Sequence, residues 1–104
     1  MQEYQIAEIL KALSRPSRIK ILQVLEKGEM CVGELEGRVK IKQSNLSQHL
    51  RILKDRRILK CERRGMEVCY WIRDRKVLDV IKCAKIFLPK EANIRDKLEV
   101  NPLV

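Results

Sequence analysis

The spacing of apolar residues changes from a helical period to a strand period near residue 58. Before that point, apolar side chains recur three or four residues apart, which predicts helices over about 3–13, 16–27, 32–39 and 43–57. After it, ILKCERRGMEVCYWI (58–72) carries β-branched and aromatic residues around Gly65, a pattern typical of a β-hairpin. A last helix is expected over 75–88, before Pro89. The order α-α-α-α-β-β-α predicts a mainly α fold with one small β-hairpin.

Two of these helices form a candidate helix-turn-helix. Only KIK (40–42) separates the third predicted helix from the fourth. In the fourth, Leu46, Leu50 and Leu53 repeat at i, i+4 and i+7, so one face of this helix is apolar. A helix-turn-helix followed by a basic hairpin is the layout of a winged helix, a fold that places one helix in the major groove of DNA.

The positive charge of the chain is concentrated in this region. The 104 residues carry a formal net charge of +9. Between Arg38 and Arg64 there are ten basic residues, and only Asp55 and Glu62 oppose them. Such a cluster indicates a polyanionic partner. No apolar run approaches the roughly 18 residues of a membrane span, so we expect a cytoplasmic protein with no membrane partner.

The exposed face of the fourth helix carries side chains suited to reading DNA. At 100° per residue, Ser44, Gln48 and Arg51 point most directly away from the leucine stripe, and Asn45 and Ser47 flank them. These residue types hydrogen-bond to base edges and phosphates. His49 lies about 60° from the stripe by the same count. We interpret it as a partly packed, locally hydrogen-bonded histidine in preference to a base or metal contact.

The hairpin tip adds two arginines. Arg63 and Arg64 could enter a minor groove or contact phosphates, and the alternative is that they are ordinary solvated turn charges. Their position beside a basic helix favours phosphate contact.

Four segments resemble the ArsR/SmtB family of winged-helix repressors: ALSRPSRIKIL (12–22), EMCVGEL (29–35), QSNLSQHLRIL (43–53) and VCYWI (68–72). The resemblance covers residues 5 to about 88. It implies a homodimer built through the first and last helices, with each recognition helix and wing on one half of a palindromic double-stranded DNA operator. It also implies release by an inducer, often a metal or metalloid ion. Residues 1–90 would form the DNA-binding and dimerisation domain, and 91–104 a C-terminal tail.

The same resemblance extends the set of candidate DNA contacts. Lys40 stands where the family often has glycine and Lys42 where it often has a capping serine, and both departures add positive charge near DNA. The candidate DNA-binding residues are Lys42, Gln43, Ser44, Asn45, Ser47, Gln48, His49, Arg51, Arg63 and Arg64.

The inducer sites of the family are incomplete here. Cys31 matches the first thiol of an arsenic-sensing CVC-like segment, whereas Gly33 replaces the second. The zinc-type site would need an Asp and three His, and the corresponding positions hold Asp74, Lys76, Phe87 and Lys90. The two positions of the persulfide-sensing thiols hold Gln23 and Pro89.

Three further cysteines remain. Cys83 lies on the last helix near the implied dimer interface and, with Cys31, is a candidate ligand of a soft ion such as As(III). Cys61 and Cys69 are expected on opposite strands of the hairpin, facing each other across a three-residue loop, as a redox switch or as ligands. The alternative for each cysteine is a small buried side chain.

These features together predict a dimeric, sequence-specific transcriptional repressor that a thiol-reactive signal releases from DNA. The alternatives are a DNA binder without an inducer, a thiol redox-responsive regulator, or a winged helix used for protein contacts, which the clustered charge disfavours. An enzyme is not expected, because no nucleophile stands beside a base and no glycine-rich phosphate loop is present.

Overall fold

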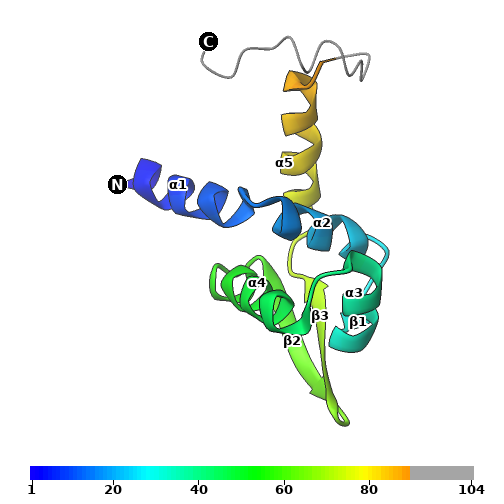
Figure 1. Ribbon diagram of the computed structural model, residues 1–104. Helices are drawn as coiled ribbons and strands as arrows, with labels where there is room; N and C mark the ends of the chain where they lie inside the picture. Colours follow the sequence, from blue (N-terminus) through cyan, green and yellow to red (C-terminus); the bar gives the residue numbers. More distant parts are fainter. Residues whose placement is uncertain (90–104) are drawn as a thin grey trace.

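The computed structural model describes residues 1–89 and confirms the predicted order of helices and hairpin (Figure 1). Its elements are α1 (Gln2–Leu13), α2 (Pro16–Leu25), β1 (Met30–Cys31), α3 (Val32–Val39), α4 (Gln43–Asp55), β2 (Leu59–Arg64), β3 (Glu67–Ile72), α5 (Lys76–Ala84) and the 3-10 helix η1 (Lys85–Phe87). The predicted tail and Lys90 lie outside the described residues. The last helix is shorter than expected, because its final turn tightens into η1.

The helix-turn-helix and the wing lie away from the outer parts of α1 and α5. In Figure 1, α5 and the β2–β3 hairpin, here called the wing, project from opposite ends of the molecule, and α1 extends to the side. Helix α2 lies between these parts and contacts α3, α4 and α5. The fold therefore separates a candidate DNA-binding end from a second end formed by α1 and α5.

The core consists of the apolar stripes that the sequence predicts. The side chains of Leu46, Leu50 and Leu53 on α4 are fully buried, as are Leu22 on α2 and Leu35 on α3. Burying a leucine side chain stabilises a fold by about 1.5–3 kcal/mol. This packing fixes which face of α4 points to solvent.

A third strand, which the sequence analysis did not predict, joins the hairpin. Strand β1 pairs antiparallel with β3, so the sheet order is β1-β3-β2, and Cys31 lies opposite Cys69. A two-residue strand shows no alternation by which a sequence pattern could identify it. Because β1 pairs with β3, the start of α3 is attached to the wing.

The predicted register of the hairpin is wrong. Arg64 pairs with Glu67, so the loop contains two residues, Gly65 and Met66, rather than three. Cys61 consequently lies opposite Tyr70, while Cys69 lies opposite Glu62. Since successive residues of a strand point to opposite faces, Cys61 and Cys69 lie on different faces of the sheet and do not face each other.

Candidate nucleic-acid interface

The exposed face of α4 carries the predicted DNA-reading side chains. Ser44, Gln48 and Arg51 are exposed, on the side of the helix away from the buried leucines. Lys42, Gln43, Asn45 and Ser47 are also exposed. Arg51 makes one ion pair, to Asp55 at 3.9 Å, between two largely exposed side chains. Such a pair is weak and leaves the guanidinium free to exchange partners.

The turn before α4 is held in an unusual backbone conformation. Lys40 ends α3 with φ 58° and ψ 45°, the left-handed region that favours glycine. Lys42 begins α4 without a side-chain hydrogen bond to the helix. Both lysines are exposed and occupy positions where Gly and Ser, respectively, are favoured locally. The turn is therefore less stable than one with Gly and Ser at these two positions, and it places two positive charges beside α4.

His49 is half-buried and is tied to α2. Arg18, only 8% exposed, donates from Nε to His49 Nδ1 at 3.1 Å and from Nη1 to the Ala12 carbonyl at 3.2 Å. Burial lowers the pKa of His49, and the positive charges of Arg18 and Arg15 lower it further. The partner is thus distant in sequence rather than local, and the contact anchors α4 to the α1–α2 corner.

Arg64 of the wing is already engaged within the molecule. Its guanidinium donates two hydrogen bonds to Glu29, one of them at 3.2 Å, and pairs with Glu62 at 3.2 Å. Its Cζ lies 5.9 Å from the centre of the Trp71 ring. We call Glu29, Glu62, Arg64 and Trp71 the wing clamp. The hydrogen bond from Arg64 to Glu29 is the main reason that the pKa of Arg64 is raised.

Arg63 is different. It is exposed and makes no ion pair within residues 1–89. Of the two wing arginines, Arg63 has the free charge, whereas Arg64 is paired with both Glu29 and Glu62.

Two of the four cysteines are joined. The structure pairs Cys31 with Cys69 in a disulfide between β1 and β3. Cys61 is half-buried and Cys83 is exposed on α5, and both are free. Across residues 1–89, no three His, Cys, Asp or Glu side chains gather in a way that could hold a metal ion. Within residues 1–89, Cys31 therefore has one nearby thiol, Cys69.

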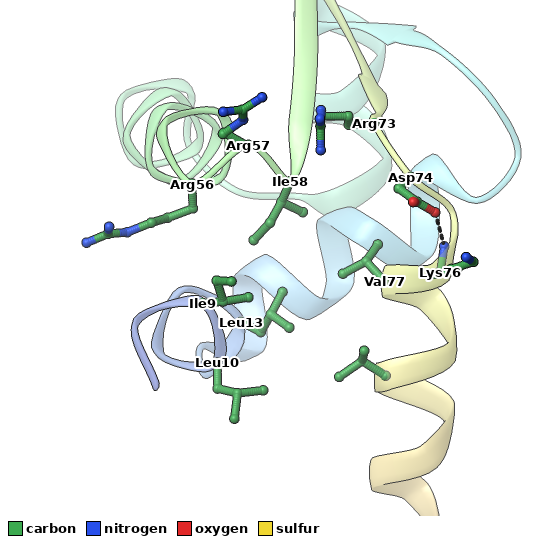
Figure 2. Close-up of a pocket in the computed structure, with 11 residues that line it drawn as sticks. Ile9, Leu10, Leu13, Arg56, Arg57, Ile58, Arg73, Asp74, Lys76 and Val77 are labelled. Carbon is green, nitrogen blue, oxygen red and sulfur yellow. Dashed lines mark hydrogen bonds between the residues drawn. The ribbon is translucent and has the colours of Figure 1, made fainter. Parts of the chain in front are cut away.

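The other end of the molecule exposes apolar side chains on α1 and α5. On α1, Tyr4 is 69% exposed, and Ile9 and Leu10 are also exposed; Phe87 in η1 is 85% exposed. An open groove of about 540 Å³ lies among α1, the start of α5 and the α4–β2 turn (Figure 2). Its floor is apolar, and its charged lining residues are Arg56, Arg57, Arg73, Asp74 and Lys76.

The sequence analysis missed two residues, Arg18 and Glu29, and it gave Cys69 the wrong partner. Arg18 falls on the inner face of α2, at helical spacing from Leu22 and Leu25. Its burial could therefore have been predicted from that spacing. Glu29 and Cys69 join the interface only through the pairing of β1 with β3. No local pattern predicts that pairing.

Comparison with known proteins places the chain in a family. Residues 15–60 match the model of the bacterial regulatory protein, arsR family. An HTH-type transcriptional regulator of Methanocaldococcus jannaschii is 40% identical over 84 residues, which are 79% of this chain and 94% of that protein. A transcriptional repressor SmtB homolog of Synechocystis is 36% identical over 81 residues, which are 78% of this chain and 61% of that longer repressor.

A solved structure agrees with this placement. The solution structure of the homodimeric winged helix-turn-helix DNA-binding domain of Mb0332 from Mycobacterium bovis has a TM-score of 0.72 and 25% identity, and the alignment covers 82% of this chain and 79% of that one. The winged-helix prediction is confirmed, and so is the expectation of a regulator in place of an enzyme. No helix in residues 1–89 is long and apolar enough to cross a membrane. The chain belongs to the arsR family of bacterial regulatory proteins.

Proposed function

We propose that this protein is a dimeric transcriptional repressor that binds palindromic double-stranded DNA, with α4 in the major groove and the wing beside it. The observation that carries the proposal is the exposed face of α4, where Ser44, Gln48 and Arg51 stand opposite a buried leucine stripe within the most basic part of the chain. Short polar side chains and an arginine on such a face match the donors and acceptors of base edges.

The contacts divide into two classes. Gln48 and Asn45 are amide side chains that can bond to adenine in two places, and Arg51 can bond in the same way to guanine. Lys42, Lys40 and Arg63 are better suited to phosphates, which add affinity without sequence information. His49 is held by Arg18, so its role is to position α4.

Dimerisation through α1 and α5 would cover the apolar side chains that the single chain exposes. Apolar patches of this kind are typical of protein interfaces, and the similar Mycobacterium domain is homodimeric. A Leu10→Lys variant should shift the protein to monomer in light scattering and weaken binding to a two-half-site duplex. Lys20→Ala, on the exposed side of α2, is the control.

We propose further that a thiol-reactive signal relieves repression. The candidates are Cys31 and the exposed Cys83 on α5, with As(III) as the soft metalloid to test. Operator binding by the reduced protein should be titrated with As(III), Sb(III), Cd(II), Zn(II) and a persulfide donor, then repeated with Cys31→Ser. Release that requires Cys31 would support the proposal, and binding that neither these reagents nor hydrogen peroxide changes would contradict it.

The test of DNA reading uses a duplex selected from a random pool by the reduced protein. Gln48→Ala and Arg51→Ala should each lower affinity for that duplex by about 1–3 kcal/mol and relax preference at one base pair. Lys20→Ala removes a charge outside α4 and the wing and should change neither property. Unchanged affinity in both α4 variants would refute the assignment of α4 as the recognition helix.

A further inference from the structure

We propose that Cys31 and Cys69 form a reversible regulatory disulfide, made by a peroxide, which lowers DNA affinity by holding Glu29 against Arg64 of the wing. The inference rests on the proposed function and specifies its signal and its mechanism. It assigns Cys31 as the thiol that is oxidised first and Cys69 as the thiol that completes the bond.

The two cysteines sit at the junction between the helix-turn-helix and the wing. Cys31 ends β1 and is also the N-cap residue of α3, while Cys69 lies opposite it in the middle of β3. On either side of this bond, Glu29 bonds to Arg64, and the Gly33 N–H donates to Glu67 Oε1 at 3.4 Å. Besides the backbone pairing of β1 with β3, the bond is thus the central member of three connections made by side chains between the start of α3 and the wing.

The exposure of the two sulfur-bearing residues assigns their order of reaction. Cys31 is partly exposed, whereas Cys69 is 0% exposed. The N-terminus of a helix also favours a thiolate over a thiol. A small oxidant therefore reaches Cys31, and Cys69 meets only the product formed on Cys31.

The number of thiols favours a disulfide over a bound metalloid. A trivalent arsenic ion prefers about three thiolates, but within residues 1–89 no third ligand stands near this pair. Cys61 points to the other face of the sheet, and Cys83 lies on α5. A disulfide needs only two facing thiols, which Cys31 and Cys69 supply.

The chemistry balances with a peroxide as the oxidant. The Cys31 thiolate attacks hydrogen peroxide, the O–O bond breaks, and the leaving hydroxide takes up a proton to become water. Cys31 is then a sulfenic acid. The Cys69 sulfur attacks the Cys31 sulfur, the S–O bond breaks, and the leaving hydroxide takes the Cys69 proton as a second water. Two thiols lose two electrons, and the peroxide gains them.

The link to DNA is the wing clamp. Bonded sulfur atoms are about 2 Å apart, whereas non-bonded heavy atoms need about 3.5–4.0 Å, so reduction requires the two sulfurs to separate, and β1, which pairs with β3 over only two residues, is the part that gives way. Glu29 lies immediately before β1, and this movement draws its carboxylate away from Arg64. In the oxidised protein Arg64 is paired with both Glu29 and Glu62, whereas in the reduced protein only the exposed pair with Glu62 remains, a weak surface pair that a phosphate can displace.

The experiment uses the full chain with Cys61→Ser and Cys83→Ser, so that only the proposed pair can react. The reduced protein first selects a duplex from a random pool. Hydrogen peroxide is then added, a tryptic map locates any disulfide, and fluorescence anisotropy measures affinity before oxidation, after it and after dithiothreitol. We expect a Cys31–Cys69 peptide, the mass loss of two hydrogens, and a loss of affinity of about five-fold or more that dithiothreitol reverses.

Two variants separate the bond from its effect. Cys31→Ser should neither form the bond nor lose affinity with peroxide, and it should fold well because serine is a favoured N-cap. Glu29→Ala should still form the bond but lose less affinity on oxidation. Glu34→Ala, which removes an equal charge from α3 outside the clamp, should respond as the parent does.

Several results would overturn the inference. These are a disulfide that leaves affinity unchanged, no disulfide at all, or release by arsenite but not by peroxide through the same two cysteines. A reduced protein that selects no duplex would overturn the proposed function and the regulatory part of the inference, while the tryptic map would still decide whether the bond forms.

Discussion

Replacing Lys42 with serine should stabilise the fold and weaken DNA binding at the same time. Lys42 is the N-cap of α4, with φ −56° and ψ 143° and no side-chain hydrogen bond to the helix. Its carbonyl accepts the first helical hydrogen bond from Leu46 at 2.8 Å, so the N–H groups of Gln43, Ser44 and Asn45 precede that ladder. A serine hydroxyl at this position can accept from one of those N–H groups.

The expected size of each effect follows from this geometry. A capping side chain stabilises a helix terminus by about 1 kcal/mol, which corresponds to a rise in Tm of about 4–8 °C for a domain of this size. Serine cannot neutralise the phosphate that Lys42 would meet. The slope of log affinity against log salt concentration should therefore become shallower by about 0.9 for each phosphate left without its lysine.

Calorimetry at fixed protein concentration measures Tm, and fluorescence anisotropy over a salt series measures the dependence of DNA affinity on salt. Lys42→Gln is the matched control, because glutamine removes the charge but is not a favoured N-cap. It should reproduce the change in salt slope without the rise in Tm. If Lys42→Ser leaves Tm unchanged, or if the salt slope stays that of the parent, the account of this turn is refuted.

Three further predictions concern single residues. Lys40→Gly should raise the unfolding free energy in urea by about 1 kcal/mol by relieving the left-handed backbone; a decrease would show that the lysine is not strained. Because the pKa of His49 is lowered in the fold, the unfolded chain binds its proton first, so stability should fall as the pH drops below about 6.5. His49→Gln should flatten this response below about pH 6.5, and an unchanged slope would contradict it. Leu50→Ala should cost about 2–5 kcal/mol in urea denaturation, since it leaves a cavity in a fully buried stripe; a smaller cost would mean that the stripe is not the core.

The helices and the exposed face of α4 could be predicted because both follow from the helical spacing of apolar residues, which can be read directly from the sequence. Leu46, Leu50 and Leu53 recur at helical spacing, and once they are inward the direction of Gln48 follows. The wing could also be predicted, because β-branched and aromatic residues surround Gly65, whose φ is 67°.

The pairing of the cysteines could not be predicted, because a shift of one residue in the register of the hairpin changes which side chains face each other. With a three-residue loop Cys61 would face Cys69, and with the observed two-residue loop it faces Tyr70. The partner that Cys69 does have comes from a two-residue strand 38 positions earlier in the chain. The contact between Arg18 and His49 likewise joins residues 31 positions apart.

The bond between Cys31 and Cys69 also bears on the lifetime of the protein. It closes a loop with a sequence separation of 38 residues, which contains α3, α4 and β2. Restricting the unfolded chain over such a loop stabilises the folded state by about 4 kcal/mol on the entropy relation for cross-links. Where proteolysis follows the population of the opened state, a stabilisation of that size lowers the rate of cleavage by a large factor. Oxidation would then preserve the regulator while removing it from DNA, so that a cell returning to reducing conditions restores repression from stored protein without new synthesis.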